Sequence, residues 1–286
     1  MRSKFHISNE PLICLSHNSD FEYLTIGGYS RLVYIVSNRS GKILSQLKGH
    51  TYQIYAVQFN PNHKQVVSGG KEKDLYFWDI PTQSLKNKLK GHLSHILDLF
   101  YYNEDVVLSG SLDSTAKIWD IRSNKCVQTF DDATDGVLRV LAVENEIITT
   151  STDGCLRTYD IRNNKLIVDA HYSPITDVQL FKGGKQLLTY SQDGIVRTIQ
   201  RENGKLFKKC IREPFTTNLK CKLMGNDDKI VCGDSDGVVT VYDANGTIAN
   251  EIKCHEKCVQ SISCHTSENK FASIGEDGFL NLHFNV

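Results

Sequence analysis

Three residues near the middle of the chain could form a hydrolase site. Ser109, His92 and Asp113 supply a hydroxyl, an imidazole and a carboxylate, the groups of a nucleophilic triad. The same groups can instead form a buried relay, in which the imidazole meets the carboxylate and the hydroxyl, and the indole N–H of Trp119 joins the network. Because this set sits at positions that recur in part along the chain, we expect a structural relay and no catalytic residue.

A second group of residues has ligands that suit zinc. It comprises Cys254, His255, Cys258, Cys264 and His265. Their spacing matches none of the usual zinc patterns, and His255 also occupies a repeat position. We therefore expect no metal and no cofactor. The sequence also lacks a phosphate-binding Gly-Lys-Ser/Thr loop, a nucleophile elbow and a dinucleotide fingerprint, so we do not expect an enzyme.

Composition argues against several other classes of function. Lys plus Arg and Asp plus Glu both number 33, and the basic residues are dispersed without interleaved aromatics, so direct nucleic-acid binding is not expected. No apolar run reaches 18 residues, and the N-terminus has no apolar core like that of a signal peptide, so we expect no membrane span. Nine Cys without framework spacing indicate a reducing compartment, the cytoplasm or the nucleus.

The elements that position these residues come from a repeat. An aromatic residue followed by Asp occurs at Trp78, Trp119, Tyr159 and Tyr242, at intervals of 41, 40 and then 83 residues, which is two steps. Weaker copies end near residues 36, 199 and 283, which makes seven copies in all. An Asp lies six residues before the aromatic position in the last five copies, and Ser30 and Glu72 fill that position in the first two. A fixed period of this size indicates stacked copies of one small unit.

A His lies 27 or 28 residues before the aromatic position in four copies, at His50, His92, His171 and His255. A Gly-His start and a Trp-Asp end resemble the signature of a WD-repeat blade, which has four strands. Such blades stack radially into a propeller. The resemblance predicts an all-β fold, a seven-bladed WD-repeat β-propeller.

The pattern within one unit supports strands. Residues 96–99, 106–109, 116–119 and 126–130 read as four short strands, with turn residues at 110–114 and 122–125. Seven units of about 41 residues account for the 286 residues, so we expect a single propeller domain over 1–286. The last copy stops three residues after His283 and lacks a fourth strand, which residues 4–8 can supply. That pairing would leave no unpaired edge.

Finer sequence resembles one family of WD-repeat proteins, the mitogen-activated protein kinase organizer family. Residues 49–55, 68–71, 108–114 and 173–176 look like its matching blades. The fourth copy carries an acidic loop at 130–137 in place of Gly-His, and 151–162 has Tyr in place of Trp, as that family shows. The resemblance implies a non-catalytic scaffold that assembles kinase-cascade components or splicing factors. It implies a monomeric propeller inside larger complexes, with protein partners, no direct nucleic acid and no membrane.

By similarity to other WD-repeat propellers, two slots in each blade face the narrower rim. The first slot lies three and five residues after the His position, and the second is the residue before the turn Asp. The first slot contains Gln53, Tyr55, His95, Leu97, Gly136, Leu138, Pro174, Thr176, Cys258 and Gln260. The second contains Lys71, Leu112, Thr152, Gln192, Ser235 and Glu276.

Apolar and aromatic side chains of these slots concentrate on copies two to four, at Tyr55, Leu97, Leu112 and Leu138. They are either a binding surface or ordinary packing at the channel mouth. Three aspartates within residues 131–135 are either an acidic patch for a basic partner or a solvated loop.

A second function is also compatible with the sequence. Residues 119–122 and 159–162 resemble the Trp-Asp-x-Arg box with which substrate receptors dock on the adaptor of a cullin-4 ubiquitin ligase. This alternative places the binding residues at Arg122 and Arg162 instead of the narrow rim.

Overall fold

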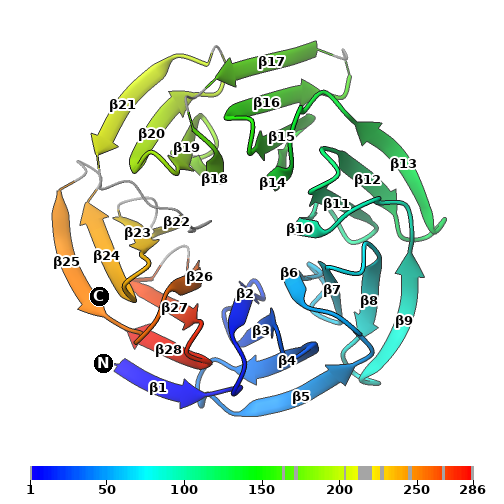
Figure 1. Ribbon diagram of the computed structural model, residues 1–286, viewed down its shortest axis with the longest axis vertical. Helices are drawn as coiled ribbons and strands as arrows, with labels where there is room; N and C mark the ends of the chain where they lie inside the picture. The colour runs from blue at the N-terminus through cyan, green and yellow to red at the C-terminus, as the bar shows by residue number, and fades with distance from the viewer. Residues whose placement is uncertain are drawn as a thin grey trace.

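Each predicted copy folds into one four-stranded antiparallel sheet, and seven such sheets form a ring (Figure 1). The computed structural model describes residues 2–162, 165–170, 173–202, 204–211, 221–225, 229–243, 247–265 and 268–284. No helix occurs among these residues, so none of them forms a helix long and apolar enough to cross a membrane. The predicted all-β, seven-bladed propeller is confirmed. His171 lies outside the described residues.

We number the blades in chain order and call the strands of each blade a to d from the channel outward. Blade 1 contains β2 (Leu12–His17), β3 (Tyr23–Gly28), β4 (Leu32–Ser37) and β5 (Ile43–Lys48). Blade 2 contains β6 (Ile54–Phe59), β7 (Gln65–Gly70), β8 (Leu75–Asp79) and β9 (Ser84–Leu89). Blade 3 contains β10 (Ile96–Tyr101), β11 (Val106–Ser111), β12 (Ala116–Asp120) and β13 (Lys125–Phe130).

The remaining blades follow the same order. Blade 4 contains β14 (Val137–Val143), β15 (Glu146–Ser151), β16 (Cys155–Asp160) and β17 (Lys165–Ala170). Blade 5 contains β18 (Ile175–Phe181), β19 (Gln186–Ser191), β20 (Ile195–Gln200) and β21 (Leu206–Ile211). Blade 6 contains β22 (Cys221–Met224), β23 (Lys229–Gly233), β24 (Val238–Asp243) and β25 (Ile248–Lys253). Blade 7 contains β26 (Val259–Cys264), β27 (Lys270–Gly275), β28 (Phe279–Phe284) and β1 (Arg2–His6).

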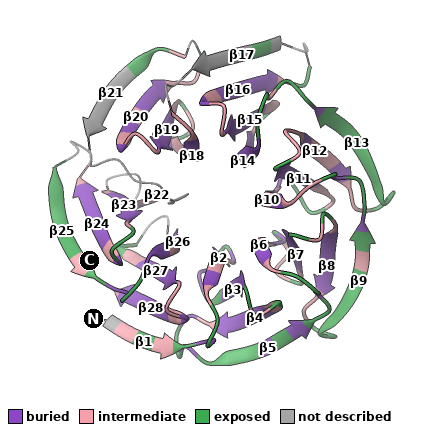
Figure 2. Cartoon of the chain, viewed as in Figure 1, coloured by how far each residue is buried: buried purple, intermediate pink, exposed green. Residues whose placement is uncertain are grey.

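The hydrophobic core lies between neighbouring blades. One cluster joins Val33 and Leu47 of blade 1 to Ile54 and Trp78 of blade 2, and similar clusters fill the other blade junctions. Strands b and c are buried because each has a blade on both sides, whereas strand d faces solvent, as in β9 and β13 (Figure 2). Adjacent apolar residues in strand b, such as Val107 and Leu108 of β11, follow from this two-sided burial.

The ring closes by pairing the two ends of the described chain. Strand β1 pairs antiparallel with β28 in blade 7, with Arg2 opposite His283 and His6 opposite Phe279. The N–H groups of Ile7 and Ser8 then donate to the Gly278 carbonyl at 3.0 and 3.2 Å. The predicted closure by the N-terminal strand is confirmed, although the strand covers 2–6 because residues 7 and 8 already belong to the turn that leads into blade 1.

A β-bulge recurs at the start of strand a. The register skips one residue in six of the described blades, at Ile13, Tyr55, Leu97, Leu138, Thr176 and Gln260. A bulged residue is left out of the ladder, and the bulge re-aims its side chain. The second member of the predicted first rim slot is therefore the bulged residue in each of the five blades where it was expected.

Candidate protein-interaction surface

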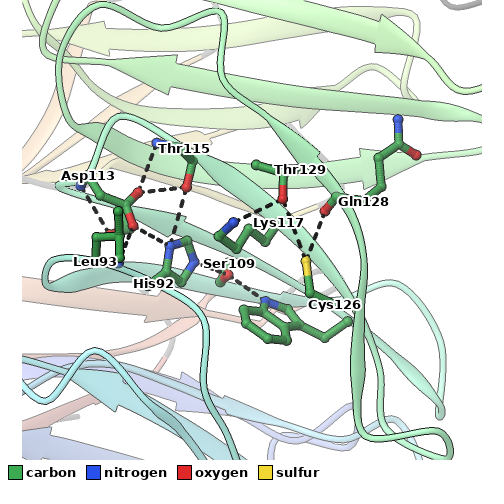
Figure 3. Close-up of polar contacts among 11 residues, drawn as sticks. His92, Leu93, Ser109, Asp113, Thr115, Lys117, Cys126, Gln128 and Thr129 are labelled. Atoms are coloured by element: carbon green, nitrogen blue, oxygen red, sulfur yellow. Dashed lines mark hydrogen bonds and ion pairs between the residues drawn. The ribbon is translucent and has the colours of Figure 1, made fainter.

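In blade 3 the four expected relay residues are joined by a continuous chain of hydrogen bonds. The Trp119 indole N–H donates to Ser109 Oγ at 2.8 Å, and Ser109 Oγ lies 2.6 Å from His92 Nε2. On the other side of the ring, His92 Nδ1 lies 2.8 Å from Asp113 Oδ2 (Figure 3). Every group is satisfied if the Ser109 hydroxyl donates to Nε2 and a protonated Nδ1 donates to Asp113. The Ser109 hydroxyl is buried, so this arrangement is structural.

The Asp113 carboxylate anchors the loop before strand a to the turn between strands b and c. It accepts hydrogen bonds from the Leu93 N–H at 2.7 Å and from the Thr115 hydroxyl at 2.6 Å (Figure 3). Burial opposes ionisation, but the bonds from His92, Thr115 and Leu93 outweigh it and hold the pKa of Asp113 below its usual range. Gly91 precedes His92 because a Cβ there would lie 3.0 Å from the Trp119 ring.

The same relay occurs with other residues in two more blades. In blade 2, Glu72 replaces Asp and bonds His50 Nδ1, while His50 Nε2 lies 2.7 Å from Ser68 Oγ. The Trp78 indole N–H donates to that Oγ at 2.7 Å. In blade 7, His255 Nδ1 lies 2.8 Å from Asp277 and Nε2 lies 3.0 Å from Ser273 Oγ. The longer Glu side chain thus serves the same purpose as Asp.

In blades 4 and 5 an arginine holds the turn Asp. Arg157 holds Asp153 with two bonds of 3.1 and 2.8 Å, and Arg197 holds Asp193 with bonds of 3.3 and 2.6 Å. Both arginines lie on strand c, four residues after the Asp. In blade 4, Ala133 occupies the His position, so the guanidinium supplies the missing donors. Sequence reasoning missed these pairs, although an Arg at the same phase in two consecutive copies was a readable signal.

The Cys and His residues near the C-terminal end take part in different structures. His255 is engaged in the blade 7 relay. Cys258 packs in the apolar cluster between blades 5 and 6, whereas Cys254 and Cys264 pack in the cluster between blades 6 and 7. Among the residues described by the structure, no group of three or more His, Cys, Asp or Glu is placed to hold a metal ion.

We call the face that carries the loops before strand a and the b–c turns the narrow rim. On this face a backbone hydrogen bond joins the two predicted slots of a blade. The N–H of the second-slot residue, which precedes the turn acid, donates to the carbonyl of the first residue of the first slot. These pairs are Lys71 with Gln53 (3.0 Å), Leu112 with His95 (2.9 Å), Thr152 with Gly136 (2.9 Å), Gln192 with Pro174 (2.9 Å) and Glu276 with Cys258 (3.1 Å). The two predicted slots therefore lie side by side in five blades. The loop that would pair with Ser235 lies outside the described residues.

Most of the predicted rim residues have accessible surface. Lys71, Leu112 and Ser235 are exposed, and Gln53, Tyr55, His95, Leu97, Thr152, Gln192, Gln260 and Glu276 are half-buried. The rings of Tyr55 and His95, from adjacent blades, lie 5.9 Å apart. Blades 2 and 3 therefore present neighbouring aromatic rings on this rim. In blade 7 the Gln260 amide donates to Glu276 Oε1 at 2.7 Å.

Four of the predicted slot residues are buried in the structure, which corrects the prediction for Gly136, Leu138, Thr176 and Cys258. Leu138 is 8% exposed and Thr176 is 3% exposed, so neither offers a side chain to a partner. The Thr176 hydroxyl donates to the Tyr190 carbonyl at 3.2 Å, which keeps it within its own blade. Leu138 is packed into the wall of the ring.

Three exposed residues on the narrow rim were not predicted. Tyr29 is 44% exposed, Tyr52 is 53% exposed and Leu93 is 80% exposed, whereas Leu112 from the predicted set is 44% exposed. Tyr52 and Leu93 were missed because they lie outside the two slots, one or two positions after the His. Tyr29 does occupy the second slot of blade 1, but Ser30 replaces the turn acid there, so that blade was left out of the prediction. Leu93 is held in place by the bond from its N–H to Asp113, so the relay presents it to solvent.

A buried ion triad joins the channel side of three blades. Arg139 of β14 forms an ion pair with Asp98 of β10 and, through Nε, with Asp177 of β18 at 2.7 Å. Asp98 also accepts the Val140 N–H at 2.9 Å. The three charged residues occupy the same position of strand a, directly after the bulge, in blades 3, 4 and 5.

The opposite rim carries the two arginines of the Trp-Asp-x-Arg-like boxes. Both side chains are largely exposed, and they lie on the c–d turns of blades 3 and 4. Arg122 lies 3.4 Å from Asp105, and Arg162 lies 3.3 Å from Asp160. Exposed pairs of this kind hold their partners weakly.

Comparison with known proteins identifies the repeat. Residues 41–79 and 83–120 match the family model described as "WD domain, G-beta repeat". Each match begins near strand d of one blade and ends with strand c of the next, so one sequence repeat links two blades.

Several proteins are similar to part of this chain. Protein tipD of Dictyostelium discoideum is 27% identical over 121 residues, which cover 42% of this chain and 20% of that protein. Pre-mRNA-processing factor 19 of Bos taurus is 29% identical over 119 residues, covering 41% and 24%. The THO complex subunit 6 homolog of Danio rerio is 34% identical over 82 residues, covering 27% and 25%. The matched part of this chain spans a quarter or less of each relative. This chain contains two matched WD repeats and folds as a seven-bladed β-propeller.

Proposed function

We propose that this propeller is a non-catalytic scaffold that binds other proteins through its narrow rim. The observation that carries the proposal is the repeated backbone bond between the two rim slots, which places side chains from two loops side by side in five blades. Loops held on a rigid scaffold are the usual place for binding. Propellers with WD40 repeats are generally interaction domains and not catalysts, which agrees with this assignment.

We propose further that the partners belong to kinase-cascade or splicing assemblies. The resemblance of residues 130–137 and 151–162 to the organizer family supports the first branch. Two similar proteins have names that refer to pre-mRNA processing and to the THO complex, which supports the second. The propeller would act as a monomer within such assemblies, in the cytoplasm or the nucleus. Its scattered Cys residues agree with either reducing compartment.

Affinity purification of the full chain followed by mass spectrometry tests this proposal. Recovery of mitogen-activated kinases supports the signalling branch, and recovery of splicing factors supports the other. The double variant Leu97→Asp with Leu112→Asp places two charges on the rim and should abolish recovery without unfolding. The matched control is Val127→Asp, which adds a charge to the exposed strand β13 of blade 3. Recovery of neither class of partner would contradict the assignment.

A second candidate function is that of a substrate receptor for a cullin-4 ubiquitin ligase. The observation that favours it is the exposure of Arg122 and Arg162 on the same rim of adjacent blades. If it holds, the double variant Arg122→Ala with Arg162→Ala loses the ligase adaptor in a pull-down. Unchanged recovery of the adaptor, or none with the parent protein, excludes it.

A further inference from the structure

Blades 1 and 2 present a cluster of tyrosines and cations on the narrow rim. Its members are Tyr29, Arg31, Tyr52, Lys71 and Lys73, and we call it the Tyr-Lys face. All five side chains are exposed. They come from the b–c turns of blades 1 and 2 and from the loop between those blades, so three separate loops converge there.

Part of the Tyr-Lys face borders a hollow of about 700 Å³. Tyr29, Arg31 and Tyr52 line it together with residues of the loop that follows β1. The loops around the hollow are fixed by hydrogen bonds: the Tyr29 N–H donates to the Pro11 carbonyl at 3.0 Å, and Arg31 Nη1 donates to the Thr51 carbonyl at 3.4 Å. The hollow is therefore built into the fold, with two aromatic rings at its edge.

Backbone geometry singles out two cations of the Tyr-Lys face, and one of them, Arg31, lines this hollow. The residue after the turn acid has a positive φ in all seven blades. Four blades use glycine there and blade 3 uses Ser114 (φ 66°), whereas blades 1 and 2 use Arg31 (φ 63°) and Lys73 (φ 69°). Glycine adopts this conformation most readily, and a long side chain there is strained. Two neighbouring blades thus hold a cation where the fold alone favours glycine, and strain of this kind points to a binding role.

Electrostatics on this face favours an anionic partner. Burial, followed by the charges of Lys71 and Lys73, lowers the pKa of His95. Within the fully described stretch 2–162, the nearby acids are largely engaged: Glu72 is bonded to His50 and Thr51, and Asp74 is half-buried near Lys88 and Lys90. Glu10 is the exposed carboxylate that lines the hollow. The three exposed cations of the Tyr-Lys face therefore outnumber the one exposed carboxylate that lines the hollow.

We propose that the Tyr-Lys face binds an acidic segment of a partner protein, with its Asp and Glu side chains on the cations and an apolar or aromatic side chain in the hollow. This inference rests on the proposed scaffold function and names the chemistry of its partner. Tyrosine rings supply rigid contact area, and surface cations steer an acidic chain toward them. Binding should weaken as salt is added, because exposed charges are screened.

The test uses a fluorescent peptide rich in Glu around a central Tyr-Leu pair, and the same peptide with every Glu replaced by Lys. The full chain should bind the acidic peptide and not the basic one. The double variant Arg31→Gly with Lys73→Gly should weaken binding about tenfold, which corresponds to two exposed ion pairs. Its melting temperature should change little, because relief of the strained φ offsets the loss of the exposed hydrogen bond from Arg31 to the Thr51 carbonyl. A structural role for the two cations would lower the melting temperature instead.

Ser114→Gly is the matched control, since it relieves the same backbone conformation in blade 3 without removing a charge. It should leave binding unchanged. Equal binding of acidic and basic peptides, or full binding by the Arg31→Gly, Lys73→Gly variant, overturns the inference. Binding of a phosphorylated peptide but not of the Glu peptide overturns the carboxylate assignment. If captured partners still bind this variant but not the Leu97→Asp, Leu112→Asp variant, the scaffold function stands and the acidic-segment inference fails.

Discussion

Relay residues show how single side chains hold the rim in place. In blade 3 one hydroxyl, that of Ser109, serves both the indole N–H of Trp119 and the imidazole of His92. A buried polar network of this kind stabilises the fold when each member is satisfied, and it becomes a liability when one member is lost. The relay residues therefore act on binding only through the position of loops such as the one that carries Leu93.

Replacement of Ser109 tests this view of the relay. Ser109→Ala leaves the Trp119 N–H and His92 Nε2 buried without their partner, so the free energy of unfolding should fall by about 1–3 kcal/mol. Urea unfolding measures it. Ser123→Ala, in the exposed turn after β12, should change stability little. Equal stability of the two variants would show that the relay contributes nothing.

Acid should weaken blade 2 through Glu72. Burial acts to raise the pKa of Glu72, but hydrogen bonds from His50 and Thr51 lower it from 4.5 to about 2. A carboxyl with a lowered folded pKa contributes stability above its unfolded pKa and loses it as the pH falls through the folded pKa. The parent protein should therefore lose more stability than Glu72→Gln between pH 4.5 and 2. Parallel acid-unfolding curves for the two proteins would contradict this.

Ion pairs on the strands support blades 4 and 5, which lack a Trp. Blades 4 and 5 have neither a Trp nor a described relay His, and their turn acids are held by Arg157 and Arg197. On the channel side, the Asp98–Arg139–Asp177 triad connects the first strands of blades 3, 4 and 5. Burial opposes the charge on Arg139, but the two carboxylates outweigh it and raise the pKa of Arg139.

Loss of the central charge should destabilise these blades strongly. Arg139→Met removes the cation that bridges Asp98 and Asp177 and leaves Asp177 only the more distant Lys222, 4.0 Å away. Breaking a buried pair costs about 3–5 kcal/mol. Arg122→Met, at an exposed arginine of the opposite rim, should cost little. Urea unfolding of both variants measures the difference. A small effect at Arg139 would mean that the triad does not hold the blades together.

Removal of β1 should open the ring. Deletion of residues 1–9 takes the outer strand from blade 7 and exposes the edge of β28, so the melting temperature should fall strongly. Adding a synthetic peptide of residues 1–9 should restore part of the loss. An unchanged melting temperature after the deletion would refute closure by this strand as a source of stability.

For the molecule as a whole, the repeat made most of the fold predictable. Trp78, Trp119 and the turn acids recur in phase, so seven blades and the blade 3 relay could be read from spacing alone. The arginine replacements and the ion triad were missed because they depend on comparing the same position across copies, for example Asp98, Arg139 and Asp177. The burial of Leu138 and Thr176 could not be predicted, since it is set by the packing of the ring and not by their place in the repeat.

Hydrogen exchange of the captured complex shows whether partners bind the narrow rim. Amides of the loops at 29–31, 51–55, 71–73 and 93–97 should be protected when a partner is bound, whereas the opposite rim at 60–64, 102–105 and 121–124 should exchange as in the free protein. Protection confined to the opposite rim would contradict the account.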